Sequence, residues 1–157
     1  MPRRILVASD LSDCSRAAID CGALIAHEWG ATVQLLYVSR VPEVLAGDAV
    51  LLGDAFVDAD VIKGHKELDR IVSELARAGV TCTSKVRTGF ADDVLIEEAN
   101  SGQYDLLVMG THGRSGFKRL YLGSVAAKVA RRARIPVLTV PARSAVWDSS
   151  ASSPVSQ

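Results

Sequence analysis

The residue types best suited to hold a phosphate group are concentrated between residues 104 and 141. A largely apolar run, 105–109, leads into a loop that begins at Gly110, and Gly123-Ser124 then opens a segment with helical spacing. Glycines allow backbone N–H groups to approach an anion closely, and the first turn of a helix offers N–H groups that have no acceptor within the helix. A strand, a glycine-rich loop and a helix start in this order predict nucleotide binding.

Two common phosphate-binding motifs, the G-x-x-x-x-G-K-[ST] loop and the G-x-G-x-x-G dinucleotide fingerprint, are absent from the sequence. The glycines instead follow the spacing Gly110-x-x-Gly113, nine residues, then Gly123-Ser124, with Met109 before and Val125 after. This pattern resembles the nucleotide-binding signature of the universal stress protein family. The resemblance covers about the first 142 residues, including the strand-like runs 5–10 and 33–38.

The resemblance implies an adenine nucleotide as ligand, namely ATP, with or without Mg²⁺. It implies that Asp10 or its adjacent backbone receives the adenine or ribose, that the Val38 backbone bonds to the adenine edge, and that the glycine loop approaches the phosphates. Gly123 and Ser124 would present N–H groups and a hydroxyl at the helix start. The full set of implied binding residues is Ala8, Ser9, Asp10, Val38, Met109, Gly110, Gly113, Arg114, Gly123, Ser124 and Val125.

Each of these residues also has a structural interpretation. Asp10 precedes a predicted helix and would serve equally well as its cap. Val38 fits a core strand, and the glycines would shape turns in any protein. Arg114 fits a solvated basic face as well as a phosphate site. His112 has no carboxylate partner in the sequence pattern, so no catalytic residue is assigned.

Hydrophobic periodicity predicts five strands that alternate with four helices. The strands are expected near 5–8, 32–38, 80–86, 105–109 and 135–141, and the helices near 13–29, 56–78, 91–101 and 123–134. Gly30 and Gly79 stand where glycine commonly ends a helix. The segment 39–55 is apolar but contains Pro42, and it is expected to form a lid over the ligand or part of a subunit contact.

The inner faces of the first two helices follow from the same periodicity. The first helix is expected to bury Ala17, Ala18, Cys21, Leu24, Ile25 and Trp29. The second is expected to bury Val57, Val61, Leu68, Val72 and Leu75, with a partly buried His65 on the same stripe.

Alternating strands and helices predict an α/β protein with a single-domain, open, parallel five-stranded sheet and helices on both faces, a Rossmann-like fold. Ligands of such sheets bind beyond the carboxyl ends of the strands, where the strand order reverses. This rule selects the loops that contain Asp10 and Gly110–Gly123. The family resemblance implies the strand order 3-2-1-4-5.

The 157 residues are 48% apolar and 23% charged, which fits one globular domain, expected over 1–142, followed by a Ser-rich disordered tail over 143–157. No apolar run is long enough to span a membrane or to act as a signal peptide, so a cytoplasmic protein without a membrane partner is expected. Cys14, Cys21 and Cys82 form no C-x-x-C pair, and free thiols are expected, with a redox sensor as the alternative.

The net charge of zero hides an asymmetry. Residues 1–105 hold 10 Lys and Arg against 17 Asp and Glu, whereas residues 106–157 hold 8 against a single Asp. The basic half carries the glycine loop, which suits an anionic ligand. Aromatic residues make up only 5% and do not alternate with the basic ones, so nucleic acid is not expected as a partner.

These observations predict an adenine-nucleotide-binding regulatory protein of the stress response. The alternatives are a weak ATPase or autokinase using the same site, a structural dimer that binds no nucleotide, and a binder of cyclic nucleotides. No catalytic base is recognisable, so slow turnover is the most that the motif supports. The resemblance implies a homodimer through the last strand, although Pro136 and Pro141 would equally protect the edge of a monomer.

Overall fold

The five strands and four helices expected from the sequence are all present. The computed structural model describes residues 1–40, 49–111 and 122–141. Along the chain the elements are β1 (Arg4–Ser9), α1 (Asp13–Trp29), β2 (Thr32–Ser39), α2 (Ala49–Arg77), β3 (Cys82–Thr88), α3 (Ala91–Ala99), β4 (Leu106–Gly110), α4 (Ser124–Arg132) and β5 (Val137–Val140). Among the described residues, no helix has the length and apolar character needed to cross a membrane. The predicted tail, 143–157, lies outside the described residues.

The strands form one parallel sheet in the order β3-β2-β1-β4-β5, which confirms the predicted fold and strand order. The register between β1 and β2 continues to Ser9↔Tyr37, at the carboxyl end of β1. The register between β1 and β4 stops two residues earlier, at Val7↔Val108. The central strands therefore separate at their carboxyl ends, which is also where the strand order reverses.

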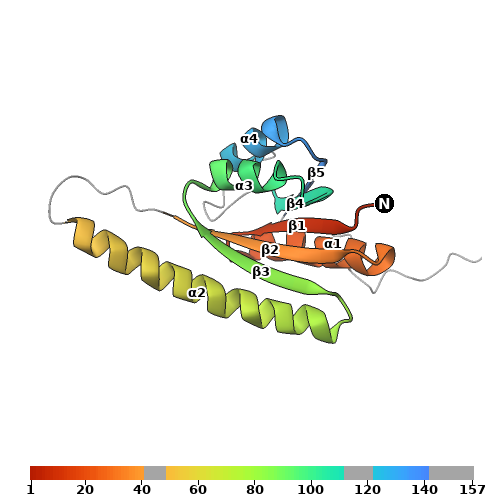
Figure 1. Cartoon of the computed structure of the whole chain (residues 1–157), viewed down its shortest axis with the longest axis horizontal. Helices are drawn as coiled ribbons and strands as arrows, with labels where there is room; N and C mark the ends of the chain where they lie inside the picture. Colours follow the sequence, from red (N-terminus) through yellow and green to blue (C-terminus); the bar gives the residue numbers. More distant parts are fainter. Residues whose placement is uncertain (41–48, 112–121, 142–157) are drawn as a thin grey trace, which may run out of the picture.

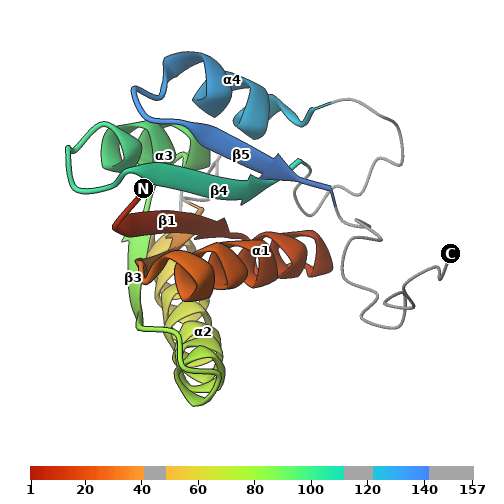
Figure 2. The same ribbon diagram turned by 90° about the vertical axis from the view of Figure 1, so that its right-hand side faces the viewer.

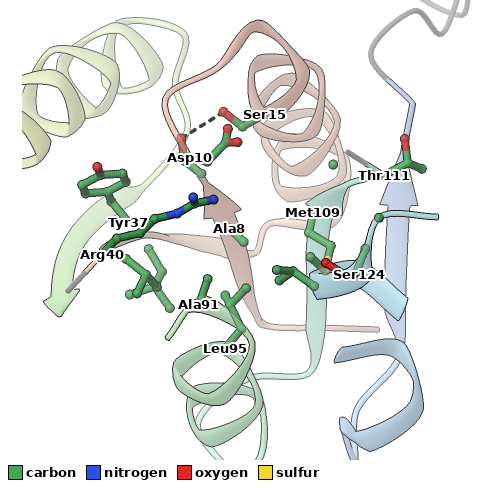
Figure 3. A pocket seen from close by; sticks show the side chains of 17 residues that line it. Ala8, Asp10, Ser15, Tyr37, Arg40, Ala91, Leu95, Met109, Thr111 and Ser124 are labelled. Carbon is green, nitrogen blue, oxygen red and sulfur yellow. Dashed lines mark hydrogen bonds between the residues drawn. The ribbon is translucent and has the colours of Figure 1, made fainter. Parts of the chain in front are cut away.

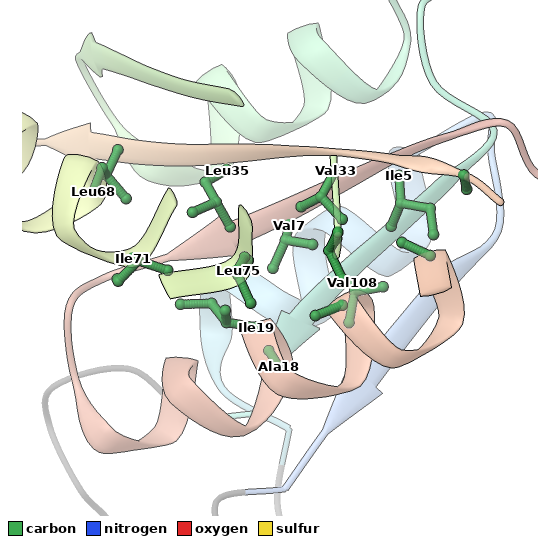
Figure 4. Close-up of a cluster of buried hydrophobic side chains, with 14 of the residues drawn as sticks. Ile5, Val7, Ala18, Ile19, Val33, Leu35, Leu68, Ile71, Leu75 and Val108 are labelled. Atoms are coloured by element: carbon green, nitrogen blue, oxygen red, sulfur yellow. The ribbon is translucent and has the colours of Figure 1, made fainter. Parts of the chain in front are cut away.

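Helices cover both faces of the sheet (Figures 1 and 2). Helices α1 and α2 pack on the face that carries Ile5 and Val7, whereas α3 and α4 pack on the face of Leu6 and Ala8. Consecutive residues of β1 are thus buried on opposite sides, as a strand covered on both faces requires. Figure 4 shows the larger apolar cluster, in which Ile5 and Val7 of β1 and Val33 and Leu35 of β2 meet α1 and α2.

The end of α1 at Gly30 confirms the predicted stop, and the start of α1 is capped by Ser12. The Ser12 side chain accepts the Ser15 N–H at the first turn, and Gly30 ends the helix in the left-handed region with φ 62°. The predicted inner face of α1 was partly wrong, because Leu24 and Trp29 are exposed. Gly22 contacts the Val7 side chain and defines the inner face, which places Leu24 about 200° around the helix, while Trp29 is the last helical residue.

Helix α2 begins at Ala49, seven residues before the predicted start, so residues 49–55 are helical. Residues 41–48 of the predicted lid or subunit contact lie outside the part of the chain that the structure describes. The buried stripe of α2 contains Leu68, Ile71 and Leu75. The prediction of a partly buried His65 was wrong: Gly64, not His65, faces the sheet, and the histidine is exposed.

The helix-to-strand boundary after α2 also differs from the prediction. The Val80 N–H donates to the Leu75 carbonyl at 3.0 Å, so Val80 closes the end of the helix and β3 starts at Cys82. Burial raises the pKa of the Cys82 thiol to about 11. Cys14, Cys21 and Cys82 are all free, which confirms that no pair among them forms a disulfide.

Candidate functional site

The candidate site is a crevice at the carboxyl edge of the sheet, where β1 and β4 separate (Figure 3). Its cavity volume is about 170 Å³, which exceeds the roughly 150 Å³ of a cavity known to hold a benzene ring. Its walls are formed by three strands (β1, β2 and β4) with the residues that directly follow them, and by residues of α1, α3 and the start of α4. They are Ala8, Ser9, Asp10, Ser15, Leu36, Tyr37, Val38, Arg40, Ala91, Leu95, Met109, Gly110, Thr111, Gly123, Ser124, Val125 and Ala126.

The turn that follows β1 is fixed by short-range hydrogen bonds. Asp10 Oδ1 accepts the Ser12 N–H at 3.0 Å and also the Ser12 hydroxyl. Ser9 Oγ accepts the N–H of Leu11, a non-glycine residue with a φ of 62°. The Asp10 side chain thus holds the turn that precedes α1, whose N-cap is Ser12 and not Asp10, and Asp10 also lines the crevice.

The end of β2 is held from the side opposite the crevice. Tyr37, only 2% exposed, donates its hydroxyl to Asp60 Oδ2 at 2.7 Å, and the Ser39 hydroxyl donates to the same oxygen at 2.8 Å. Both bonds tie β2 to α2, while Leu36 and Val38 face the crevice side of the sheet. The strand that carries Val38 is therefore fixed before any ligand binds.

The β4–α4 side supplies the polar end of the crevice. The Thr111 N–H donates to the Val140 carbonyl at 3.0 Å, and the Gly123 N–H donates to the Thr111 carbonyl at 2.7 Å. In this structure the Gly123 N–H therefore has the Thr111 carbonyl as its acceptor, and its expected approach to a phosphate stays a prediction. In the part of this loop and helix that the structure describes, the first-turn N–H groups of α4, beginning at Ser124, have no acceptor within the helix and are available to an anion.

Helix α3 forms a further wall of the crevice, which the sequence did not predict. Ala91 and Leu95, one helical turn apart, line the crevice and give it an apolar side. The loop before this helix is fixed at Gly89, whose N–H donates to the Ser39 carbonyl at 3.0 Å and whose φ of 152° disfavours other residues. The available signal was the strand-to-helix turn at Gly89, since such turns in parallel sheets lie on the ligand side.

The structure brings together nine of the eleven predicted site residues, namely Ala8, Ser9, Asp10, Val38, Met109, Gly110, Gly123, Ser124 and Val125. Gly113 and Arg114 lie outside the described residues, as does His112. The residues that were not predicted include Ser15, Tyr37, Arg40 and Thr111, in addition to the α3 wall.

The arrangement is chemically asymmetric. Ala8, Leu36, Val38, Ala91 and Leu95 form an apolar part, and Ser124 with the first turn of α4 forms a polar part that favours negative charge. Within the described ranges, no group of three or more His, Cys, Asp or Glu residues is placed to hold a metal ion. The crevice thus suits a ligand with a flat apolar portion and an anionic end.

Comparison with known sequences gives a consistent result. The sequence profile described as "Universal stress protein family" matches residues 1–141. Universal stress protein YxiE of Bacillus subtilis is 31% identical over 149 aligned residues, which cover 89% of this chain and 99% of YxiE. Universal stress protein MJ0531 of Methanocaldococcus jannaschii is 30% identical over 138 residues, which cover 88% of this chain and 81% of that protein.

Solved structures share the same fold. The universal stress protein UspA from Lactobacillus plantarum has a TM-score of 0.81 at 22% identity. The aligned part is 87% of this chain and 96% of the UspA chain. A universal stress protein in complex with cAMP has a TM-score of 0.62 at 29% identity, over 88% of this chain and 97% of that one. A family protein from Arabidopsis thaliana with AMP bound has a TM-score of 0.61 at 23% identity, over 90% and 92%.

Proposed function

The chain belongs to the universal stress protein family, and on that premise we propose that its crevice binds an adenine nucleotide, ATP in particular. The purine occupies the apolar part between β1, β2 and α3, and the phosphates lie at the first turn of α4. Binding of the nucleotide regulates the protein by changing its conformation or the surface that it presents to a partner protein. Such a nucleotide-dependent switch fits a regulatory role in the stress response.

The observation that carries this proposal is the early end of the β1–β4 pairing at Val7↔Val108. Beyond that pair the two strands leave room between Asp10 on one side and Ser124 on the other, and both residues line one crevice. A purine is flat and largely apolar, and a polyphosphate is anionic, so the asymmetry of the crevice matches the asymmetry of the ligand. The relatives described with cAMP or AMP support an adenine ligand over other nucleotides.

The same geometry favours binding over catalysis. In the described residues Ser124 is the hydroxyl best placed near the phosphates, and no carboxylate cluster stands ready to hold Mg²⁺. A magnesium ion would therefore be bound chiefly by the phosphates, with the Ser124 hydroxyl as the protein ligand. We expect a nucleotide-responsive switch that turns over ATP slowly or not at all.

The test is a panel of ATP, ADP, AMP, cAMP and GTP, measured by thermal shift and by isothermal titration calorimetry. ATP at one hundred times its Kd should stabilise the fold by about 2.7 kcal/mol, and GTP should have a weaker effect. Absence of binding by every adenine nucleotide would contradict the proposal.

A pair of serine variants tests where the phosphates lie. Ser124→Ala should weaken ATP severalfold while leaving adenosine unchanged, because the lost hydroxyl lies at the phosphate end. Ser73→Ala, which removes an exposed hydroxyl from the outer side of α2, is the matched control and should bind ATP as the wild type does. Equal ATP affinity of the Ser124 variant and the wild type would place the phosphates elsewhere.

The expected homodimer also belongs to this proposal. Strand β5 is an edge of the sheet, and its Leu138 side chain is 37% exposed. Pairing of two β5 strands would cover this edge and join the two sheets. We propose this arrangement as the quaternary structure, with one nucleotide crevice in each subunit.

A further inference from the structure

Arg40 is a cationic residue of the crevice that the nucleotide motif does not include. It follows β2 directly and lines the crevice from the side of Val38 and Tyr37. Its side chain is exposed, and within the described residues it makes no hydrogen bond or ion pair. Figure 3 shows the Arg40 side chain extending from the end of β2 towards the end of β1, where Ala8 and Asp10 lie.

The position of Arg40 separates it from the phosphate end. In the sheet order β3-β2-β1-β4-β5, β1 lies between the strand that precedes Arg40 and the strand that leads to α4. The donors suited to phosphate are in the first turn of α4, beginning at Ser124. Arg40 therefore stands over the apolar part of the crevice and away from the anion-binding part.

The apolar part of the crevice lies on the side of the sheet that α3 covers. Leu36 and Val38 come from the sheet, and Ala91 and Leu95 come from α3. A flat ring that rests one face against these side chains would have its other face available to a group from the end of β2. A guanidinium group is planar and weakly hydrated, and it stacks on aromatic faces. Among the described residues on this side, Arg40 has the reach and the planarity to cover that second face.

We propose that Arg40 is a specificity-determining residue whose guanidinium stacks on the outer face of the bound purine. The purine is then held between apolar side chains and a planar cation, and purines are preferred over the smaller pyrimidines. This inference rests on the proposed nucleotide site and adds a residue and a mode of base recognition to it.

The experiment compares adenosine, AMP and ATP as ligands of the wild type and of Arg40→Ala by isothermal titration calorimetry. Adenosine is decisive because it has the base and no phosphate. Loss of the stacked cation should weaken all three ligands by a similar factor, about 3- to 30-fold. Arg40→Lys keeps the charge but not the plane, and it should recover only part of the loss.

Arg77→Ala is the matched control for charge. It removes one exposed arginine from the end of α2, which lies near the amino ends of the strands, whereas the crevice lies at their carboxyl ends. This variant should leave all three affinities unchanged. Since Arg40 has no partner among the described residues, the thermal midpoint of Arg40→Ala without ligand should equal that of the wild type. Arg40→Gln provides a second variant if that midpoint falls.

The possible results separate this inference from the function on which it rests. Weakening of AMP and ATP with adenosine unchanged would overturn it, because Arg40 would then contact phosphate. Unchanged affinity for all three ligands would overturn it as well, and in both cases the nucleotide site itself would stand. A wild type that binds none of the three would overturn the nucleotide site and this inference together.

Discussion

Gly64 shows how a single residue sets the distance between a helix and the sheet. It lies in the middle of α2, where glycine is unfavourable by about 1 kcal/mol relative to alanine. A Cβ at this position would lie 2.4 Å from Cδ1 and 2.8 Å from Cε1 of Tyr37. The ring cannot move aside easily, because Tyr37 is buried and its hydroxyl is bonded to Asp60. Close approach of α2 to β2 therefore requires glycine here.

We predict that Gly64→Ala lowers the free energy of unfolding by about 1–3 kcal/mol, because overpacking against a fixed ring outweighs the gain in helix propensity. Urea denaturation of the two proteins measures the difference. His65→Ala, at the neighbouring exposed position of the same helix, is the control and should change stability by less than about 0.5 kcal/mol. A Gly64→Ala protein as stable as the wild type would show that α2 can shift away from Tyr37.

At the scale of elements, an ion cluster attaches α3 to the edge of the sheet. Glu98 of α3 is 4% exposed, and its Oε1 accepts Lys85 Nζ at 2.5 Å and Arg87 Nη1 at 2.7 Å, both from β3. Burial alone would raise the pKa of Glu98, but the two cations outweigh it and the pKa is lowered. Because α3 also carries Ala91 and Leu95, this cluster helps to position the apolar wall of the crevice.

The lowered pKa predicts how stability depends on pH. As pH falls below about 5, the unfolded chain, in which a glutamate has a pKa of about 4.3, takes up the proton before the folded chain does. The contribution of Glu98 is therefore complete above that range and is lost as pH falls through the lowered pKa of the folded state. Glu98→Gln should lower the free energy of unfolding by about 1–3 kcal/mol at pH 7 and by much less near pH 3.

Urea denaturation of both proteins at a series of pH values measures this difference. Glu97→Gln is the matched control, because Glu97 also contacts Arg87 but is 68% exposed. It should change stability by less than about 1 kcal/mol at either pH. A Glu98→Gln difference that stays constant from pH 7 to pH 3 would show that charge is not what holds α3 in place.

Elements were predictable wherever the signal is local. Ser12 and Gly30 mark the ends of α1 through hydrogen bonds and a backbone angle that those residue types favour. The order of strands and helices follows from periodicity, although the strand order 3-2-1-4-5 came from the family resemblance. The start of α2 at Ala49 was missed, because Gly53 and the preceding Pro42 suggested irregular structure.

The features that the sequence did not predict, in the helices and at the site, have a common cause. Which residue of a helix faces the sheet depends on close contacts such as Gly64 with Tyr37 and Gly22 with Val7, and these form only in the folded chain. The hydrogen bond from the Gly123 N–H to the Thr111 carbonyl depends in the same way on segments that are distant in sequence. So does the position of Arg40 and Leu95 in one crevice. The motif located the crevice, while tertiary packing decided which groups line it.

At the scale of the molecule, the two edges of the sheet differ. Strand β3 carries Lys85 and Arg87, and charged side chains on an edge strand oppose pairing with another sheet. Strand β5 has the sequence Val-Leu-Thr-Val without a charge between its flanking prolines. The contrast makes β5 the edge suited to pairing with a second copy.

The hydrogen bonds of β5 identify the groups that such pairing would use. The carbonyls of Pro136 and Val140 accept N–H groups from Leu107 and Thr111, so the even-numbered positions are directed towards β4. The backbone groups of Val137 and Thr139 are consequently directed to the free edge of the sheet. A change at Thr139 can thus remove an edge donor without removing a hydrogen bond inside the subunit.

We predict that Thr139→Pro raises the dissociation constant of the homodimer at least about tenfold, because proline removes that N–H and its ring obstructs an approaching strand. Analytical ultracentrifugation over a range of concentrations measures the change, and circular dichroism checks that the subunit remains folded. Thr139→Val keeps the N–H and the strand shape, and this control should dimerise as the wild type does. A Thr139→Pro protein that still dimerises as tightly would exclude β5 as the dimer interface. A wild type that is monomeric at every concentration would exclude the homodimer itself and leave each crevice to act within a single subunit.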